Sequence, residues 1–83
     1  MKIRIKLYAM LAEYLPAGAE KNEADLEVAD GATVQRVILD LGLPDKHCHL
    51  VLVNGAFVPP EERARKELEE DDQLAIWPPV AGG

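Results

Sequence analysis

One short segment, residues 33–44, constrains the fold more than any other part of the chain because it carries a complete helix signal. Thr33 is a favoured N-terminal cap, with a side-chain oxygen that accepts a hydrogen bond from an otherwise unpaired helical N–H. Four apolar residues follow at helical spacing: Val34, Val37, Ile38 and Leu41. Gly42 suits the left-handed residue that ends a helix, and Pro44 prevents continuation. The segment therefore predicts one main helix with a single apolar face.

Three other segments alternate polar and apolar residues, which is the period of a strand with one buried face. They cover residues 2–8, 22–29 and 73–77. The first shows the pattern in full, with two sets of side chains on opposite faces: Ile3, Ile5 and Leu7 against Lys2, Arg4 and Lys6. Residues 9–15 predict a short helix between the first two strands. Its apolar face would consist of Met10, Leu11, Tyr14 and Leu15.

A hairpin is predicted in the second half of the chain. Residues 50–53 are a continuous apolar run, which predicts a strand buried on both faces. Asn54-Gly55 is the strongest two-residue hairpin signal, so residues 56–58 should form a short return strand. Residues 61–68 are highly charged and are predicted to form a helical turn or an irregular loop. The apolar face of that segment would be weak: Ala64 and Leu68.

This order of elements predicts an α+β fold of the β-grasp (ubiquitin-like) type, in which a mixed sheet is crossed by one main helix. The first and last strands would be central. The helix would cover the apolar side of residues 2–8 and leave their charged side open. We expect one folded domain over residues 1–77 and a flexible C-terminal tail over residues 78–83.

The composition argues against several classes of function. The formal net charge is −6, so phosphate backbones and anionic membranes would repel the domain, and we expect neither nucleic acid nor membrane as a partner. Cys48 is the only cysteine, which forbids an intramolecular disulfide and favours a reducing compartment. The sequence shows no signal peptide and no apolar run long enough to span a bilayer, so we expect a cytoplasmic protein.

The tail carries the clearest functional signal. It consists of six residues: Pro78, Pro79, Val80, Ala81, Gly82 and Gly83. The two glycines have no Cβ, so a terminal carboxylate could thread a narrow channel, and the two prolines favour an extended exit. Fully extended, six residues reach at most about 20 Å. A carboxylate is inert at neutral pH until it is activated, most plausibly by adenylation, so we expect Gly83 to be the working group.

The chain resembles the sulfur-carrier family, which includes the small subunit of molybdopterin synthase and, more distantly, the sulfur carrier of thiamin thiazole synthesis. The resemblance rests most on residues 71–83, which contain an acidic turn, a last strand and the ending Pro-Pro-Val-Ala-Gly-Gly. This ending points to the molybdopterin branch. Residues 2–8, 31–34 and 53–55 support the resemblance, which extends over the whole chain.

The resemblance implies a carrier that is not itself an enzyme and binds no cofactor or metal. An E1-like adenylating enzyme, using ATP and magnesium, would activate Gly83, and a sulfur donor would convert it to a thiocarboxylate. The loaded tail would then enter the large subunit of molybdopterin synthase and donate its sulfur in molybdenum cofactor biosynthesis. The catalytic side chains of that step would belong to the partner.

The sequence leaves three alternatives open. The chain could serve the thiamin pathway, or it could be a ubiquitin-like modifier that is conjugated to other proteins through the same glycine. It could also be a plain interaction domain without tail chemistry. Rescue of the matching auxotroph, covalent adducts that depend on Gly83, and deletion of Gly82-Gly83 would distinguish these hypotheses.

Several side chains are candidates for docking. Phe57 and Trp77 are interpreted either as anchors at a protein interface or as partly buried core residues. The row of Lys2, Arg4 and Lys6 is interpreted as the solvent face of a strand, with docking to acidic groups as the alternative. The acidic residues at 61–62 and 69–72 are interpreted as a solvated surface, with a docking role for some of them as the alternative.

The cluster His47-Cys48-His49 suggests metal ligands or a Cys–His nucleophile. In an extended segment, however, neighbouring side chains point to opposite faces, so only the two histidines could share one ion. Two ligands make a poor zinc site. We therefore prefer a loop that enters a strand, with Cys48 packed as a small hydrophobic residue.

Overall fold

Five strands form one mixed sheet in the order β2-β1-β5-β3-β4, in a computed structural model that describes residues 1–79. The strands are β1 (Lys2–Leu7), β2 (Glu23–Glu27), β3 (Leu50–Val53), β4 (Ala56–Phe57) and β5 (Gln73–Trp77). β1 and β5 are parallel, and the other neighbours are antiparallel. The first and last strands are therefore inside the sheet, as predicted, and the arrangement is the β-grasp fold.

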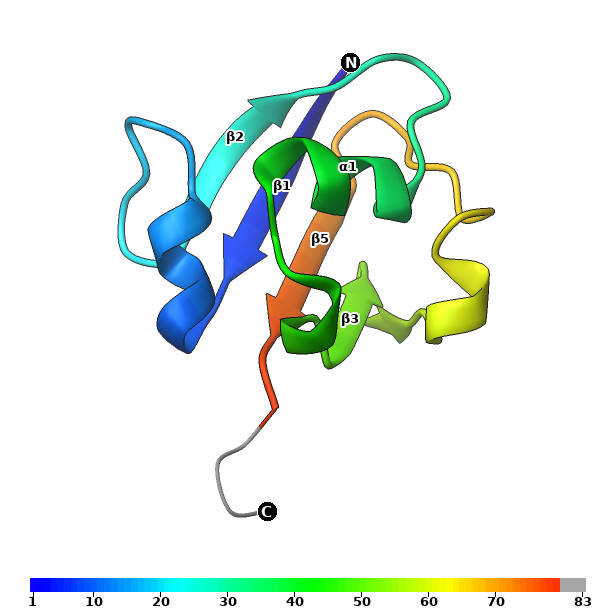
Figure 1. The fold of residues 1–83 in the computed structure, drawn as a ribbon. Helices are drawn as coiled ribbons and strands as arrows, with labels where there is room; N and C mark the ends of the chain where they lie inside the picture. Colours follow the sequence, from blue (N-terminus) through cyan, green and yellow to red (C-terminus); the bar gives the residue numbers. More distant parts are fainter. Residues whose placement is uncertain (80–83) are drawn as a thin grey trace.

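One α-helix, α1 (Val34–Leu41), lies across one face of the sheet (Figure 1). Both of its predicted ends are confirmed. The Thr33 hydroxyl accepts a hydrogen bond from the Arg36 N–H at 3.1 Å, and Gly42 adopts the left-handed conformation with φ of 76°. Beneath the helix, the core is mostly aliphatic and is filled from β1, β3, β5 and α1: Ile3, Ile5, Leu7, Val51, Val53, Leu74, Ile76, Val34, Val37 and Ile38.

The opposite face of the sheet carries no helix within residues 1–79, and this corrects the prediction for residues 50–53. We expected β3 to be buried on both faces. Val51 and Val53 are buried, but Leu50 is exposed and Leu52 is only half-buried, because their side chains point to the uncovered face. A continuous apolar run normally indicates a strand between two layers. Here its outward half forms an apolar surface instead.

The hairpin after β3 is confirmed. Asn54 and Gly55 have φ of 50° and 85°, the pair of positive angles that a type I′ turn requires. The return strand β4 is one residue shorter than predicted, although the Val58 N–H still donates to the Val51 carbonyl at 2.8 Å.

Residues 59–72 connect β4 to β5 and begin with a 3₁₀ turn, η3 (Pro60–Glu62). This segment closes the N-terminal end of α1, because the Arg63 and Lys66 carbonyls accept hydrogen bonds from first-turn N–H groups of the helix, each at 2.9 Å. The predicted apolar face is half wrong. Leu68 is buried, but Ala64 is exposed and the neighbouring Arg63 is buried in its place.

The predicted helix after β1 is a 3₁₀ helix, η1 (Ala9–Tyr14). In this geometry side chains three residues apart share a face. Leu11 is buried and Tyr14 is half-buried, whereas Met10 is exposed, contrary to the prediction. A second short 3₁₀ helix, η2 (Asp45–His47), precedes β3. Within residues 1–79, no helix has the length and apolar character required to cross a membrane.

Candidate functional site

The end of β5 fixes the point at which the chain leaves the sheet. Trp77 is the last residue of this strand and pairs with Leu50 of β3. Its carbonyl accepts a hydrogen bond from the His49 N–H at 3.0 Å, and the Ile76 carbonyl accepts one from Tyr8 at 3.2 Å. Because β5 lies in the middle of the sheet, the exit point is held from both sides.

The residues after Trp77 are those with the predicted carrier role. Pro78 and Pro79 follow the strand directly and are outside the sheet. Val80, Ala81, Gly82 and Gly83 lie outside the described residues. Their predicted roles, including activation of Gly83, therefore remain predictions, as does the division between domain and tail.

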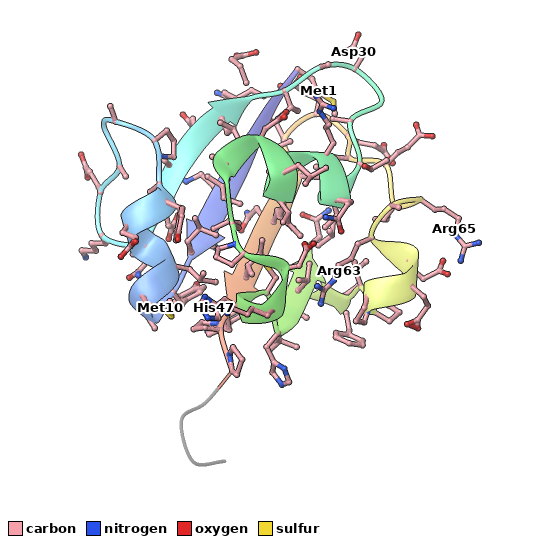
Figure 2. All side chains as sticks on the ribbon, viewed as in Figure 1. Met1, Met10, Asp30, His47, Arg63 and Arg65 are labelled. Atoms are coloured by element: carbon pink, nitrogen blue, oxygen red, sulfur yellow. The ribbon has the colours of Figure 1, made fainter. Side chains whose placement is uncertain are left out.

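Sequence reasoning missed a buried arginine that supports this exit point. Arg63 has an exposed fraction of 5% and donates to the Cys48 carbonyl at 2.9 Å and to the His49 carbonyl at 3.4 Å. Within residues 1–79 no carboxylate forms an ion pair with it. Figure 2 shows Arg63 turned toward the inside of the domain, whereas Arg65 points away from it. Nothing in the charged run from 61 to 68 distinguishes the two arginines.

Arg63 supports the exit point indirectly, through the backbone of His49. Its guanidinium holds the carbonyls of residues 48 and 49, and the N–H of His49 in turn binds the Trp77 carbonyl. The segment 59–72 is thereby linked to the end of β5. This chain of contacts stabilises the end of β5, from which Pro78 and Pro79 continue.

The uncovered face of the sheet carries a group of apolar side chains around the exit point, which we call the apolar patch. It consists of Tyr8, Leu50, Leu52, Phe57 and Trp77. The strand register places these residues together, because Leu50 lies opposite Trp77 and Leu52 lies opposite Phe57. The Tyr8 and Trp77 rings are stacked, with their centroids 4.3 Å apart and their planes 2° from parallel. A cavity of about 390 Å³ lies over the patch between β1 and the hairpin turn.

Both predicted docking residues belong to the apolar patch. Phe57 is 56% exposed, and Trp77 is half-buried under the Tyr8 ring. An exposed aromatic group of this kind is typical of a protein-binding surface. The sequence did not identify Tyr8, Leu50 and Leu52 as partners, because only the pairing of β3 with β4 and β5 brings them together.

The other half of the uncovered face is charged. The row of Lys2, Arg4 and Lys6 lies on this face as predicted. Arg4 pairs with Asp25 at 2.9 Å and with Glu23 at 3.1 Å, and these hydrogen bonds raise the pKa of its guanidinium. Its charge is therefore offset by β2, whereas Lys2 and Lys6 form no ion pair within residues 1–79. The uncovered face thus carries charged side chains of both signs on the β2 side and apolar side chains on the β3 side.

Cys48 and His49 form the loop into β3, in agreement with the preferred interpretation, whereas His47 is the last residue of η2 and is not in an extended segment. Cys48 is buried in the core, where burial raises the pKa of its thiol. Its Sγ lies 3.5 Å from the Pro44 carbonyl. His47 is half-buried and His49 is exposed. Across residues 1–79, no three His, Cys, Asp or Glu side chains are arranged to hold a metal ion.

Solved structures with the same fold include small archaeal modifier proteins and subunits of molybdopterin-converting factors. It is 28% identical to SAMP1, a small archaeal modifier protein from Haloferax volcanii, with a TM-score of 0.69 and complete coverage of both chains. A putative molybdopterin converting factor subunit 1 from Pyrococcus furiosus is 24% identical, with a TM-score of 0.65 and coverage of 95% and 98%. No curated protein sequence matches the chain.

A complex of subunits 1 and 2 of the molybdopterin-converting factor from Helicobacter pylori is also similar in fold. The matching chain is 12% identical, with a TM-score of 0.61 and complete coverage of both chains. At this identity the likeness shows the fold alone. The sequence comparison is more specific, because the model of the ThiS family matches residues 5–83, which is nearly the entire chain. The chain therefore belongs to the ThiS family of ubiquitin-like sulfur carriers.

Proposed function

We propose that this chain is the sulfur-carrier subunit of a molybdopterin synthase and that it carries sulfur as a thiocarboxylate on Gly83. The observation that carries the proposal is the position of the exit point. β5 ends at Trp77, inside the apolar patch, so a protein that covers the patch would lie beside the point from which the tail begins. Family membership supports sulfur carriage. The ending Pro-Pro-Val-Ala-Gly-Gly supports the molybdopterin branch.

In this proposal the apolar patch docks on the partner and the tail delivers the sulfur. The patch would supply most of the apolar contact with the partner, with Phe57 as its most exposed aromatic side chain. From Trp77 onward the six tail residues span at most about 20 Å, enough to reach a buried pocket in a partner seated on the patch. Pro78 and Pro79 restrict the backbone, which reduces the entropy lost when the tail is inserted.

The chemistry requires two displacements at Gly83. In the first, a carboxylate oxygen attacks the α-phosphorus of ATP, and pyrophosphate leaves. In the second, hydrosulfide supplied by the sulfur donor attacks the acyl carbon of the adenylate, AMP leaves, and loss of the sulfur-bound proton gives the thiocarboxylate. Both steps would take place in an E1-like enzyme that binds ATP and magnesium. The carrier would contribute docking and an unhindered glycine, and the large subunit would catalyse the later transfer to the cofactor precursor.

A second function uses the same activated glycine. The likeness to SAMP1 over the full length of both chains favours a protein modifier, in which a lysine amine attacks the adenylate or thioester and forms an isopeptide bond. The thiamin pathway is a third possibility within sulfur carriage. It would differ in the partner that receives the tail, not in the chemistry at Gly83.

Reconstitution tests the molybdopterin assignment. The purified chain would be incubated with ATP, an activating enzyme, a sulfur donor, the large subunit and the pterin precursor, and dithiolene formation would be measured. We expect product with the native chain and none with a variant that carries one extra residue after Gly83. If the extended variant supports synthesis equally well, the proposal is wrong. Product absent with the native chain, but lysine adducts present, would favour the modifier function.

A further inference from the structure

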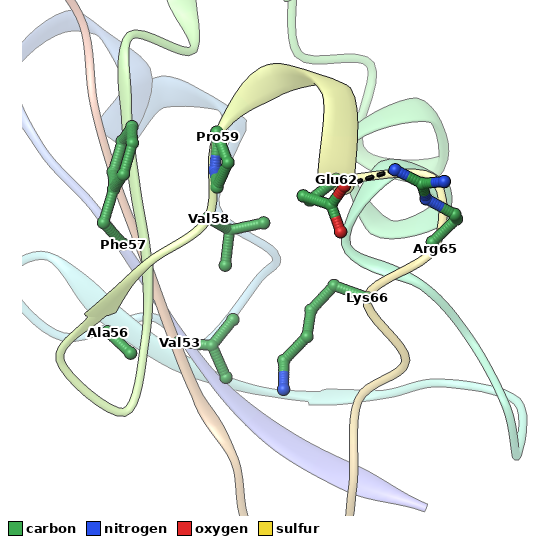
Figure 3. A pocket seen from close by; sticks show the side chains of 8 residues that line it. All are labelled: Val53, Ala56, Phe57, Val58, Pro59, Glu62, Arg65 and Lys66. Carbon is green, nitrogen blue, oxygen red and sulfur yellow. Dashed lines mark hydrogen bonds and ion pairs between the residues drawn. The ribbon is translucent and has the colours of Figure 1, made fainter.

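A groove opens at the β4 edge of the sheet, between this strand and the segment 59–66. It encloses a cavity of about 350 Å³ (Figure 3). Three of its lining residues come from the core side of the hairpin: Val53, Ala56 and Val58. Val53 and Val58 are buried and form an apolar floor, whereas Ala56 is exposed at the rim. The groove therefore gives an outside ligand access to side chains that belong to the core.

The charged side chains that line the groove are Glu62, Arg65 and Lys66, so the lining carries one net positive charge. Arg65 and Lys66 both line it and are exposed. Arg65 is paired with Glu62, but Lys66 forms no ion pair within the described part of the chain. Figure 3 shows the Lys66 side chain extended along the groove toward Val53. An unpaired ammonium beside an apolar floor is notable in a chain with a formal net charge of −6, in which 15 Asp and Glu residues outnumber 9 Lys and Arg residues.

The backbone of β4 offers further contacts. β4 is the last strand of the sheet, so its outer side has no neighbouring strand within residues 1–79. The Val58 N–H bonds to Val51 of β3, and in an antiparallel pair the direction of successive backbone groups alternates. The N–H and C=O of Phe57 therefore point away from β3. Pro59 follows and has no N–H, which limits backbone pairing to this short stretch.

We propose that this groove binds an extended segment of a partner protein that carries an apolar side chain with an acidic residue two positions away. The apolar side chain would lie over Val53 and Val58. Alternate side chains of an extended segment share a face, so the acidic residue would also face the groove and would pair with Lys66. Backbone pairing with Phe57 would fix the direction of the segment. The inference does not depend on the tail, and it holds whether or not Gly83 carries sulfur.

NMR titration of the full chain tests the inference. The probe is a capped peptide, Glu-Thr-Val-Thr-Glu, whose first, third and fifth side chains share one face. We expect amide shifts at Phe57, Val58 and Lys66. Replacing both glutamates of the peptide by lysine should weaken binding at least about fivefold, because attraction to Lys66 becomes repulsion. This comparison uses the native protein, so it is independent of the folding of any variant.

A matched pair of protein variants provides a second test of the proposed groove. Lys66→Glu should weaken binding at least about fivefold, whereas Lys21→Glu should leave it unchanged. Lys21 is also exposed but precedes β2, at the opposite edge of the sheet. Equal binding of the acidic and basic peptides, equal effects of the two variants, or shifts confined to Tyr8 and Leu52 of the apolar patch would each overturn the inference.

Discussion

Substitution of Arg63 by alanine should strongly destabilise the fold, although it lies in a charged segment, residues 61–68, that is mostly exposed. The guanidinium is 5% exposed and donates to the carbonyls of Cys48 and His49. Hydrogen bonds to a charged group contribute about 1.5–3 kcal/mol, and the Cys48 carbonyl would be left buried without a partner. Loss of side-chain packing adds to this cost. We expect the free energy of unfolding to fall by about 2–4 kcal/mol, which corresponds to a decrease in Tm of at least about 8 °C in a domain of this size.

Urea denaturation followed by Trp77 fluorescence provides the assay, because this is the only tryptophan and it lies at the end of the supported strand. Arg36→Ala is the matched control. Arg36 is exposed and pairs with Asp40 four residues away at 3.2 Å, a pair expected to contribute well under 1 kcal/mol. If Arg63→Ala and Arg36→Ala lower stability by the same small amount, the proposed support of the exit point is wrong.

Three further predictions concern the tail, the patch and the core. One residue added after Gly83 should prevent thiocarboxylate formation without changing Tm, as measured by intact mass and thermal unfolding. Phe57→Ala should change stability by less than about 0.5 kcal/mol because the ring is exposed, yet weaken binding to the large subunit about tenfold or more in calorimetry. An unchanged affinity would remove Phe57 from the interface. Burial raises the pKa of the Cys48 thiol in the folded state, so stability is retained below the pKa of the unfolded thiol and declines as the pH rises above it. Cys48→Ala should lack that decline in urea titrations at alkaline pH.

The parts of the fold that were predicted correctly are those where independent local signals agree. For α1, the cap, the apolar spacing and the terminal glycine all indicate the same boundaries, and the structure has them. The turn at Asn54-Gly55 is equally local, because it requires two positive φ angles that few other residue pairs adopt. The alternation of polar and apolar residues also predicted the strands β1 and β5 correctly.

The wrong predictions concern residues whose burial depends on contacts with distant parts of the chain. The apolar run of β3 shows that its side chains avoid water, but it does not reveal how many layers cover the sheet, so Leu50 was expected to be buried. The burial of Arg63 depends on carbonyl groups 14 and 15 residues away in the sequence. No property of residues 61–68 alone distinguishes it from Arg65.

In the candidate site, too, local features could be predicted from the sequence and features that depend on strand pairing could not. The tail and the two aromatic anchors could be identified from the sequence, because their residue types are informative by themselves. The apolar patch as a surface could not be, since Leu52 meets Phe57 and Leu50 meets Trp77 only through the pairing of strands. Tyr8 was assigned only to the end of a strand, and its stacking on Trp77 was not expected.

Gly83 is the proposed carrier of sulfur, and intact-mass spectrometry would detect that sulfur without any further assay. The purified chain would be incubated with ATP, an E1-like activating enzyme and a sulfur donor, and the product would then be fragmented. We expect a mass increase equal to the exchange of one oxygen for one sulfur, located at Gly83. An unchanged mass, with the same activating enzyme shown to load another carrier of the family, would contradict this proposal.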